Sequence, residues 1–238
     1  MTSLAHLKVK LFADGADTAS MLALNARPYI RGFTTNPTLM RKAGIANYRA
    51  FAREVIANIR DKPLCFEVLA DELPAMERQA LEIASWGDNV YVKIPITNTK
   101  RESCRPLLER LANRQVKLNV TAIMTLAQVE EILPVLNPAT ASHVSVFAGR
   151  IADTGTDPLP LMRKAAEMLR INAKAELVWA SSREIFNIFQ ADAAGCHVIT
   201  VTNDILQKLP LVGHDLDEFS LDTVKMFYED AQRAGYTL

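Results

Sequence analysis

Eight short runs with the composition of β-strands recur along the chain, and few folds accommodate so regular an alternation. The runs begin 21 to 34 residues apart, so each interval has room for one helix and two loops. They span 8–14, 30–36, 64–70, 90–96, 117–123, 143–149, 176–181 and 197–203. Eight strand–helix units in strict alternation predict a closed parallel (β/α)8 barrel, the TIM-barrel architecture of the α/β class.

The segments between the runs have the spacing of amphipathic helices. Within 48–60, Phe51, Val55 and Ile59 recur at every fourth position, and the same kind of stripe is found at 126–136, 162–170 and 183–194. A last amphipathic stretch follows the eighth run with no strand after it, so the sequence predicts an extra C-terminal helix at about 220–235. Since no linker or low-complexity tract divides the chain, we expect a single domain over 1–238.

The alternative fold is an open, doubly wound sheet. That fold usually carries a glycine-rich turn after its first strand. Here the corresponding segment, 14–17 (DGAD), has one glycine, and the chain contains neither G-x-G-x-x-G nor a Walker A sequence. The barrel is therefore favoured.

Composition excludes several classes of protein. Hydrophobic residues make up 49% of the chain, which is ample for a core and argues against disorder. Lys+Arg 27 balances Asp+Glu 27, so no basic excess is available for nucleic acid or a membrane surface. The N-terminus lacks the charged and apolar regions of a signal peptide, and no apolar run approaches the ~20 residues that span a bilayer. We expect a cytoplasmic protein.

The cysteines and histidines give no sign of a metal site. Three cysteines lie far apart with no C-x-x-C pair, which also argues against a redox dithiol or a disulfide framework. The four histidines show no H-x-x-x-H or H-E-x-x-H spacing. We expect them to be ordinary surface or strand-end residues: His6, His143, His197 and His214.

A lysine interrupts the apolar run at 90–96 (VYVKIPI). The aliphatic residues of this run share one parity and face the helices, while Lys93 has the other parity and points into the barrel. Burial disfavours the charged form of an amine, and a neutral amine can attack a carbonyl. The alternatives are a strand-end lysine that reaches solvent and an ion pair with Asp14 or Glu67. Because carboxylates close neighbouring runs, we favour the nucleophile.

Further polar residues lie at equivalent heights in other runs. Asp14 and Glu67 each close an apolar run, and Asn119 and Thr121 share one face of the run at 117–123. Packing alone would favour aliphatic residues there, so together with Lys93 the set resembles acid–base equipment for carbonyl chemistry. The alternatives are that Asp14 caps the following helix, or that either carboxylate serves only as an ion-pair partner.

Two arginines follow the sixth and seventh runs. Arg150 and Arg183 can converge on a phosphate, and a helix that begins at Arg183 would add free N–H groups. The alternative is a pair of surface arginines bound to acidic neighbours such as Asp153, Asp157 or Glu184. These two interpretations are evenly balanced on the residues alone.

In combination these motifs resemble the transaldolase family. The resemblance covers 11–203 in order and spacing, and the length matches the short subfamily that includes fructose-6-phosphate aldolase. The segments that carry it are Asp14 on the first run, then 32–37 (GFTTNP), 91–95 (YVKIP), 119–121 (NVT), 147–151 (FAGRI) and 180–183 (ASSR).

The resemblance implies Schiff-base chemistry on sugar phosphates, with no metal and no organic cofactor. Lys93 would attack the C2 carbonyl of a ketose phosphate, Asp14 would take the proton of the C4 hydroxyl, and Glu67 and Thr121 would position and activate a water. Short members of the family are oligomers, so a homo-oligomer is implied, with the terminal helix covering a neighbouring subunit as well as its own barrel. The implied substrate-binding residues are Thr35, Asn36, Asn119, Ser145, Phe147, Arg150, Ser181 and Arg183.

Two positions favour transfer over simple cleavage. The aldolase branch tends to carry Gln and Tyr where this chain has Glu67 and Phe147, and phenylalanine cannot donate the proton that would release free dihydroxyacetone. The alternatives are an aldolase, or a transaldolase for an unusual sugar, since Trp179 and Ser182 depart from the family pattern beside the phosphate motif. A non-catalytic sugar-phosphate-binding barrel is the hypothesis from another class, and the lysine–carboxylate set argues against it.

Overall fold

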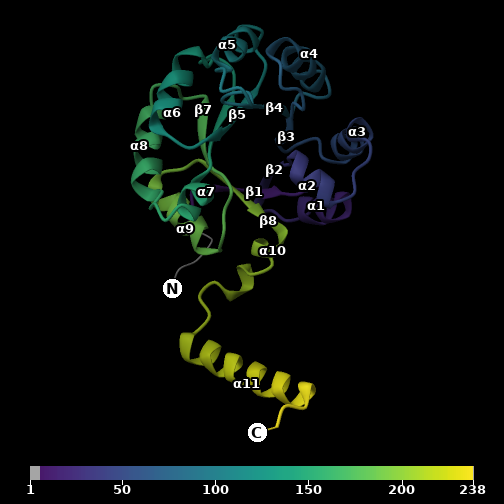
Figure 1. Ribbon diagram of the computed structural model, residues 1–238, viewed down its shortest axis with the longest axis vertical. Coiled ribbons are helices and arrows are strands. Elements are labelled where there is room, and N and C mark those ends of the chain that lie inside the picture. The colour runs from purple at the N-terminus through teal and green to yellow at the C-terminus, as the bar shows by residue number, and fades with distance from the viewer. Residues whose placement is uncertain (1–5, 238) are drawn as a thin grey trace.

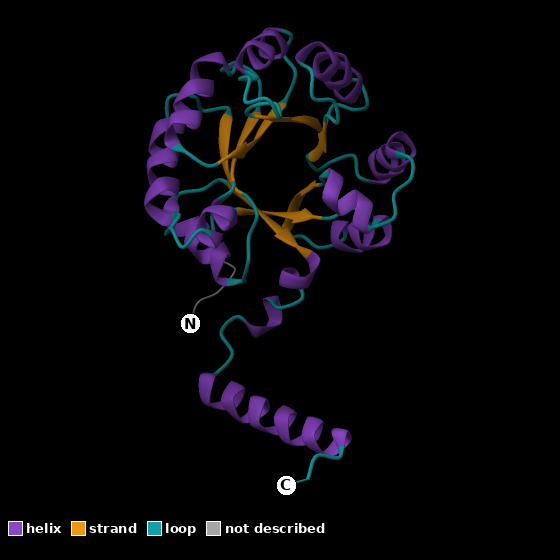
Figure 2. Cartoon of the chain, viewed as in Figure 1, coloured by secondary structure: helices purple, strands orange, loops and turns teal. Residues whose placement is uncertain are grey.

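The strands form a closed barrel in which each neighbouring pair is parallel (Figures 1 and 2). The computed structural model describes residues 6–237, so both ends of the expected domain at 1–238 lie outside the described residues. The predicted (β/α)8 architecture is confirmed. The strands are β1 (Lys10–Asp14), β2 (Ile30–Thr34), β3 (Leu64–Glu67), β4 (Val90–Pro95), β5 (Leu118–Ile123), β6 (Ser142–Val146), β7 (Ala175–Trp179) and β8 (Val198–Thr202).

Helices surround the barrel, as Figure 2 shows. They are α1 (Thr18–Asn25), α2 (Pro37–Lys42), α3 (Tyr48–Asn58), α4 (Leu73–Ala84), α5 (Arg105–Asn113), α6 (Leu126–Ile132), α7 (Ala148–Asp153), α8 (Leu159–Leu169), α9 (Phe186–Ala194) and α10 (Asn203–Leu206). Short 3-10 turns follow α6 and α10, at Leu133–Val135 and Leu209–Leu211.

Two helix boundaries differ from the expectation. The helix expected over 126–136 is α-helical only to Ile132, and Pro134, which has no N–H to donate, lies in the 3-10 turn that follows. The helix expected to begin at Arg183 begins at Phe186 instead. The N–H groups of Arg183 and Glu184 donate to Asn187 Oδ1, at 2.7 and 3.1 Å, so this segment forms a capped turn ahead of α9.

The hydrophobic core lies mainly between the barrel and the helices. Outward-facing strand residues such as Val92, Ile94, Val120 and Val144 are fully buried in this layer. The opposite parity on each strand therefore fills the inside of the barrel, where polar residues gather. Alternation along the strands thus separates an apolar outer layer from an interior that holds the polar residues together with a small apolar cluster of Phe12, Val178 and Val198.

A polar cluster fills the amino-terminal part of the barrel interior. His143 lies near the start of β6, as a strand-end histidine would, but its side chain is only 2% exposed. Its ring stacks on that of Tyr91, with the ring centres 4.2 Å apart. Its Nδ1 lies 3.7 Å from Cys65 Sγ, and its Nε2 lies 3.6 Å from Glu176 Oε2. Glu176 also binds Lys10 across the β7–β8–β1 part of the wall.

The C-terminal helix α11 (Leu216–Ala234) begins a few residues earlier than expected and lies apart from the barrel (Figure 1), so the expectation that it covers its own barrel is wrong. Asp215 caps its start and Gly235, at φ +68°, ends it in the left-handed conformation that glycine tolerates. None of its residues is buried, and Phe227 is 64% exposed. Over residues 6–237, no helix combines the length and the apolar character that crossing a membrane requires.

Candidate active site

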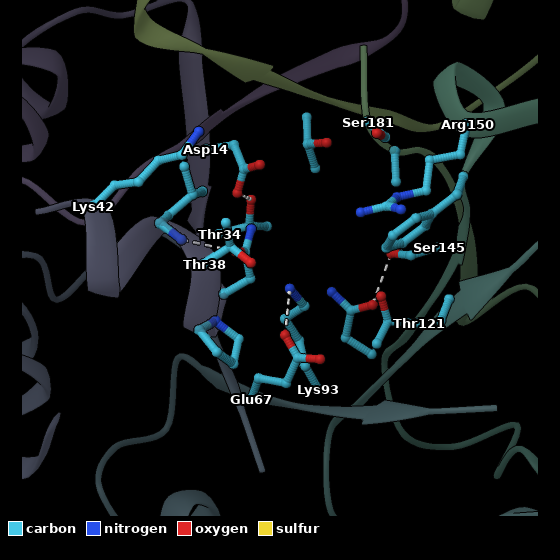
Figure 3. Close-up of a pocket in the computed structure, with 18 of the residues that line it drawn as sticks. Asp14, Thr34, Thr38, Lys42, Glu67, Lys93, Thr121, Ser145, Arg150 and Ser181 are labelled. Atoms are coloured by element: carbon cyan, nitrogen blue, oxygen red, sulfur yellow. Dashed lines mark hydrogen bonds and ion pairs between the residues drawn. The ribbon is translucent and has the colours of Figure 1, made fainter. Parts of the chain in front are cut away.

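A cavity of about 440 Å³ opens at the carboxyl ends of the strands (Figure 3). Because parallel strands end at the same rim, residues far apart in sequence meet there. Every residue predicted for the site lines this cavity except Thr35: Asp14, Asn36, Glu67, Lys93, Asn119, Thr121, Ser145, Phe147, Arg150, Ser181 and Arg183.

Lys93 lies on the cavity floor and is only 7% exposed. Its neighbours Val92 and Ile94 are in the outer core, so strand alternation directs the lysine inward. Its Nζ donates to the carbonyl oxygen of Thr35 at 2.7 Å and lies 3.2 Å from Glu67 Oε2. The ion-pair alternative is therefore observed with Glu67, and the lysine does not reach bulk solvent. The same geometry presents a buried amine to any carbonyl compound in the cavity.

Asp14, at the end of β1, faces the same cavity from a strand that does not adjoin β4, whereas Glu67 lies on the adjoining strand β3. Asp17, and not Asp14, caps α1 by accepting from the Ser20 N–H, which leaves the Asp14 carboxylate for the cavity. Thr34 Oγ1 donates to Asp14 Oδ1 at 2.6 Å. Burial raises the pKa of Asp14 above its usual range and outweighs the opposing effects of Lys93 and the Thr34 hydrogen bond. A carboxylate of this kind is a stronger base than an exposed one.

Of the two threonines at the end of β2, Thr34 lines the cavity and Thr35, the one expected there, does not. Thr34 has the parity of the barrel interior, shared with Gly32, and its hydroxyl lines the cavity. The Thr35 side chain is buried away from the cavity, and this residue reaches the site only through the carbonyl that accepts from Lys93. Gly32 faces the Phe12 ring inside the barrel, and Thr34 lies two residues after it on the same strand. Strand alternation from Gly32 could therefore have identified Thr34 as the inward-facing threonine.

Two amides and two hydroxyls supply neutral hydrogen-bonding groups. Ser145 Oγ donates to Asn119 Oδ1 at 2.7 Å, so the Asn119 amide keeps its N–H donors for the cavity. Asn36 Oδ1 caps α2 through the Leu39 N–H at 3.0 Å, which likewise leaves its amide N–H group. Thr121 Oγ1 is buried and has no hydrogen-bond partner among the described residues.

A break in the β5–β6 register places Thr121 and the next residue on the same cavity. The pairing is irregular between Val120 and Ile123, and Ala122 adopts φ +61°. Both Thr121 and Ala122 line the cavity, although regular alternation would send them to opposite faces. A non-glycine residue in this conformation is strained, and such strain concentrates at functional sites.

The side of the cavity across from Asp14 is lined by Arg150, Ser181 and Arg183, as Figure 3 shows for the first two. Arg183 pairs with Asp153 through Nε, at 3.0 Å, and through Nη2, so the ion-pair alternative is observed for this arginine. That arrangement leaves Nη1 for a ligand. The Arg150 guanidinium lies 5.8 Å from the centre of the Phe147 ring.

Close packing fixes the backbone at this side. Ser181 adopts φ +64°, and a Cβ on Gly149 would lie 1.5 Å from the Ser181 carbonyl oxygen. Only glycine allows α7 to approach this loop so closely. The N–H groups expected at a helix start are not free, because the Arg183 N–H donates to Asn187. Arginine and serine side chains are therefore the groups available here for an anion.

The two departures noted beside the phosphate motif lie outside the cavity. Trp179 is 1% exposed in the outer core, and Ser182 Oγ donates to the Thr200 carbonyl oxygen at 2.8 Å. Neither residue lines the cavity, so neither sets its size directly. Lining residues that the sequence analysis missed include Thr34, Thr38, Lys42, Ala122 and Thr200. Thr38 and Lys42 lie beyond the predicted run at 30–36, in the short helix α2 that follows it. No strand pattern could therefore identify them.

Comparison with known proteins agrees with this geometry. The sequence model of the family described as transaldolase/fructose-6-phosphate aldolase matches residues 11–238. The probable transaldolase of Streptococcus pyogenes serotype M5 (strain Manfredo) is 32% identical over 218 residues, which cover 90% of this chain and 97% of that protein. The probable transaldolase of Streptococcus pyogenes serotype M1 matches to the same extent.

Solved structures resemble the chain in fold alone. The crystal structure of KGPDC from Streptococcus mutans aligns with a TM-score of 0.56 and 11% sequence identity, over 85% of this chain and 91% of that one. A crystal structure of the same protein in complex with a ligand aligns with a TM-score of 0.55 and 9% identity, over 82% and 88%. The family match spans both the strands and the cavity residues they carry, and the chain belongs to the transaldolase/fructose-6-phosphate aldolase family.

Proposed function

We propose that the protein is a transaldolase. It transfers a dihydroxyacetone unit from a ketose phosphate, of the sedoheptulose 7-phosphate or fructose 6-phosphate type, to an aldose phosphate through a Schiff base on Lys93. The observation that carries this proposal is the Lys93 amine on the cavity floor, 3.2 Å from Glu67 and in the same cavity as Asp14. The family and its probable transaldolases support the same reaction class.

Lys93 and Asp14 perform the bond-breaking steps. The Lys93 amine adds to the C2 carbonyl, and loss of water from the carbinolamine gives a protonated imine. Asp14 takes the proton of the C4 hydroxyl, the C3–C4 electron pair moves into the imine, and C4 leaves as the aldehyde of an aldose. The three-carbon enamine stays on Lys93 until an aldose phosphate accepts it. The raised pKa of Asp14 supports its role as the base.

Glu67 and Thr121 handle the water of imine formation and hydrolysis. The Glu67 carboxylate adjoins the Lys93 amine, and the unpartnered Thr121 hydroxyl can hold a water in the same cavity. A water between them would exchange protons with Glu67 as it leaves or attacks C2. These contacts support an acid–base role for Glu67 and a positioning role for Thr121.

The remaining lining residues bind the substrate. Asn36, Asn119 and Ser145 offer amide and hydroxyl groups to the donor hydroxyls, while Thr35 contributes only its carbonyl oxygen. Arg150, Ser181 and the remaining Nη1 of Arg183 hold the phosphate. Phe147 stacks beneath Arg150 and lacks the hydroxyl that would protonate the enamine, which favours transfer over cleavage.

The proposal includes a homo-oligomer in which a second copy of this chain covers α11. Leu216, Phe219 and Phe227 lie on one face of that helix and are 80%, 43% and 64% exposed. An exposed apolar stripe of this size is typical of an interface. We expect Phe227→Glu to lower the molecular mass measured by light scattering to that of one chain, and an unchanged mass would contradict this part.

The remaining parts of the proposal concern the chain and its location. Residues 1–238 form one domain, in which α11 is an appendage of the barrel. The location is the cytoplasm, a reducing compartment in which the three free and buried cysteines stay unpaired.

Borohydride trapping tests the reaction. Incubation with fructose 6-phosphate and borohydride should leave a stable adduct on the peptide that contains Lys93. Turnover of fructose 6-phosphate should then require an added aldose phosphate, which takes up the dihydroxyacetone unit as a new ketose phosphate, whereas an aldolase would release free dihydroxyacetone without an acceptor. Absence of an adduct with every ketose tested, where a known family member reacts, would overturn the proposal and favour a binding-only barrel.

A further inference from the structure

The segment that leaves β3 is held by side chains that lie outside the barrel. Tyr48 Oη, from α3, donates to the Glu67 carbonyl oxygen at 3.0 Å. Gln79 Oε1, from α4, accepts from both the Leu69 and Ala70 N–H groups, at 2.7 and 2.8 Å. The backbone from Glu67 to Ala70 is therefore fixed by two helices that contribute nothing to the cavity lining.

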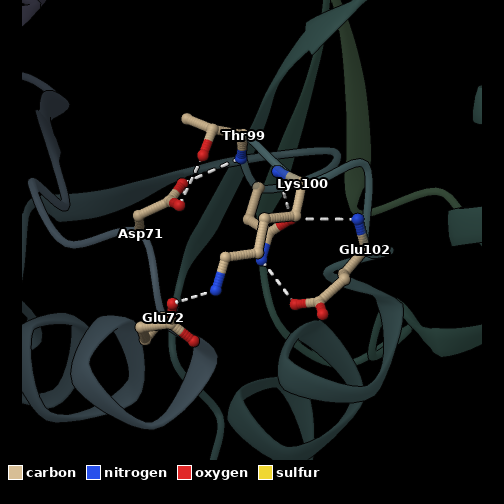
Figure 4. A network of polar contacts seen from close by, with 6 residues as sticks. Asp71, Glu72, Thr99, Lys100 and Glu102 are labelled. Carbon is tan, nitrogen blue, oxygen red and sulfur yellow. Dashed lines mark hydrogen bonds and ion pairs between the residues drawn. The ribbon is translucent and has the colours of Figure 1, made fainter.

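The same segment fixes Glu67 relative to Lys93. The two residues are paired in the β3–β4 register, and the Val68 N–H donates to the Lys93 carbonyl oxygen at 3.1 Å. Further along, Asp71 accepts from the Thr99 N–H and hydroxyl, and Lys100 binds Glu72 (Figure 4). These ties join the loops that follow β3 and β4, so the Glu67 carboxylate has a defined position 3.2 Å from Lys93 Nζ.

Tyr48 is itself held in place. Its ring packs edge-on against the rings of Phe66 and Trp86, with distances between ring centres of 6.2 and 5.7 Å. Burial raises the pKa of Tyr48, so its hydroxyl stays protonated and remains a donor. Gln79 acts differently, since one acceptor oxygen satisfies two N–H groups of an irregular segment that has no strand partner for them.

We propose that Gln79 and Tyr48 are positioning residues that act through Glu67, and this inference rests on the proposed function. Without these contacts the two N–H groups and the carbonyl would bind water instead, and the segment would move. A displacement of about 1 Å in a reacting group can reduce its contribution greatly. Glu67 would then handle the water of imine formation less effectively, although substrate binding through the other walls would persist.

The test uses Gln79→Met and Gln79→Glu. Methionine has the same length without an acceptor, whereas glutamate retains an oxygen for the two N–H groups. We expect the rate of borohydride-trapped adduct formation with fructose 6-phosphate to fall about tenfold in Q79M, part of the contribution that acid–base catalysis makes. The substrate concentration at half-saturation should not change, and Q79E should stay close to the wild type. Glu82→Gln, on the same helix, removes the ion pair with Arg49 and leaves the contacts to the Glu67–Ala70 backbone in place, so it serves as the matched control.

A double-mutant cycle separates positioning from a general loss of structure. In a Glu67→Gln background Q79M should add little further slowing, because the group through which it acts has already been changed. Equal slowing in both backgrounds would overturn the inference. If Q79M does not fold, Tyr48→Phe decides: a slower adduct with unchanged half-saturation supports the inference, and a wild-type rate overturns it.

The wild-type arm distinguishes the two proposals. An unreactive wild type would overturn the proposed function and this inference with it. A reactive wild type whose Q79M and E82Q variants both react at the wild-type rate would overturn the inference alone.

Discussion

The barrel interior contains two polar layers on the same strands. The lower layer is the cluster at the amino ends of the strands, and the upper layer consists of the polar residues that line the cavity at their carboxyl ends. The two layers differ in how the hydrogen-bonding groups of their side chains are satisfied. Cys65, Tyr91 and His143 of the lower layer each precede a cavity residue, Glu67, Lys93 or Ser145, by two positions. The lower layer is closed: His143 lies between Cys65 and Glu176 and stacks on Tyr91. The upper layer is open to the cavity.

The electrostatics of the layers differ in the same way. Burial would raise the pKa of Glu176, but hydrogen bonds from His143 and Lys10 lower it to about 2, so it stays ionised at neutral pH beside Lys10. In the upper layer burial raises the pKa of Asp14. Paired polar residues stabilise a fold, whereas residues held in place with spare hydrogen-bonding capacity can act on a substrate. We therefore expect substitutions in the upper layer to affect chemistry, and substitutions in the lower layer to affect stability.

The largest expected effect is that of Lys93→Met in the upper layer. Loss of the amine removes the only nucleophile of the proposed reaction, so transfer should fall by at least about a thousandfold. Urea unfolding should show little loss of stability, because methionine fills the site and the Glu67 carboxylate still faces the cavity. A variant that keeps trapping fructose 6-phosphate would contradict the comparison.

In the lower layer, His143→Ala should have the opposite signature. Deleting a buried, stacked ring should lower the free energy of unfolding by about 3 kcal/mol. The transfer rate per folded molecule should stay within about twofold of the wild type, since the ring does not line the cavity. Urea titration and active-site counting by trapping measure the two quantities separately. Loss of activity without loss of stability would show that the layers are coupled.

Gly149→Ala tests the anion side of the upper layer. The new Cβ would lie 1.5 Å from the Ser181 carbonyl oxygen, so the loop with Ser181 and Arg183 must shift. We expect the KM for a phosphorylated ketose to rise roughly tenfold, equivalent to one charge-assisted hydrogen bond. Trapping of dihydroxyacetone, which has no phosphate, should not change. An equal effect on both compounds would place the damage elsewhere.

The smallest expected effect is that of Thr34→Val on the acid limb of the pH profile. The Thr34 hydroxyl lowers the pKa of Asp14, so its removal raises that pKa further. Asp14 then loses its proton at a higher pH, and activity on the acid side falls while the plateau stays within about threefold. The pH dependence of kcat/KM measures this shift. A limb that moves to lower pH would mean that another group sets it.

Much of the fold was predictable because strand alternation is a local property. The parity of Lys93 among aliphatic neighbours identified an inward-facing lysine, and the carboxyl ends of the runs identified Asp14 and Glu67. Thr35 was expected in the site, but its neighbour Thr34 has the side chain that lines the cavity, since a single shift in parity reverses the face. The strand ends were predicted less well than the strands themselves: the run at 64–70, for example, is a strand only to Glu67.

Other features depend on contacts that no local pattern records. Asp153 binds Arg183 from a position 30 residues away, and His143 is buried by partners on four other strands. Gln79 and Tyr48 look like ordinary helix residues until the structure places them against the Glu67 segment. Such pairings arise from barrel closure, which brings together groups that the chain separates.

The sequence by itself determined the eight strand–helix units, the barrel and most of the polar residues at its rim, because periodicity and strand ends are written in neighbouring residues. Only the tertiary structure decided which of those polar groups are satisfied by one another and which retain free donors and acceptors. Hydrogen bonding between side chains depends on distances across the barrel, and these exist only once the eighth strand pairs with the first.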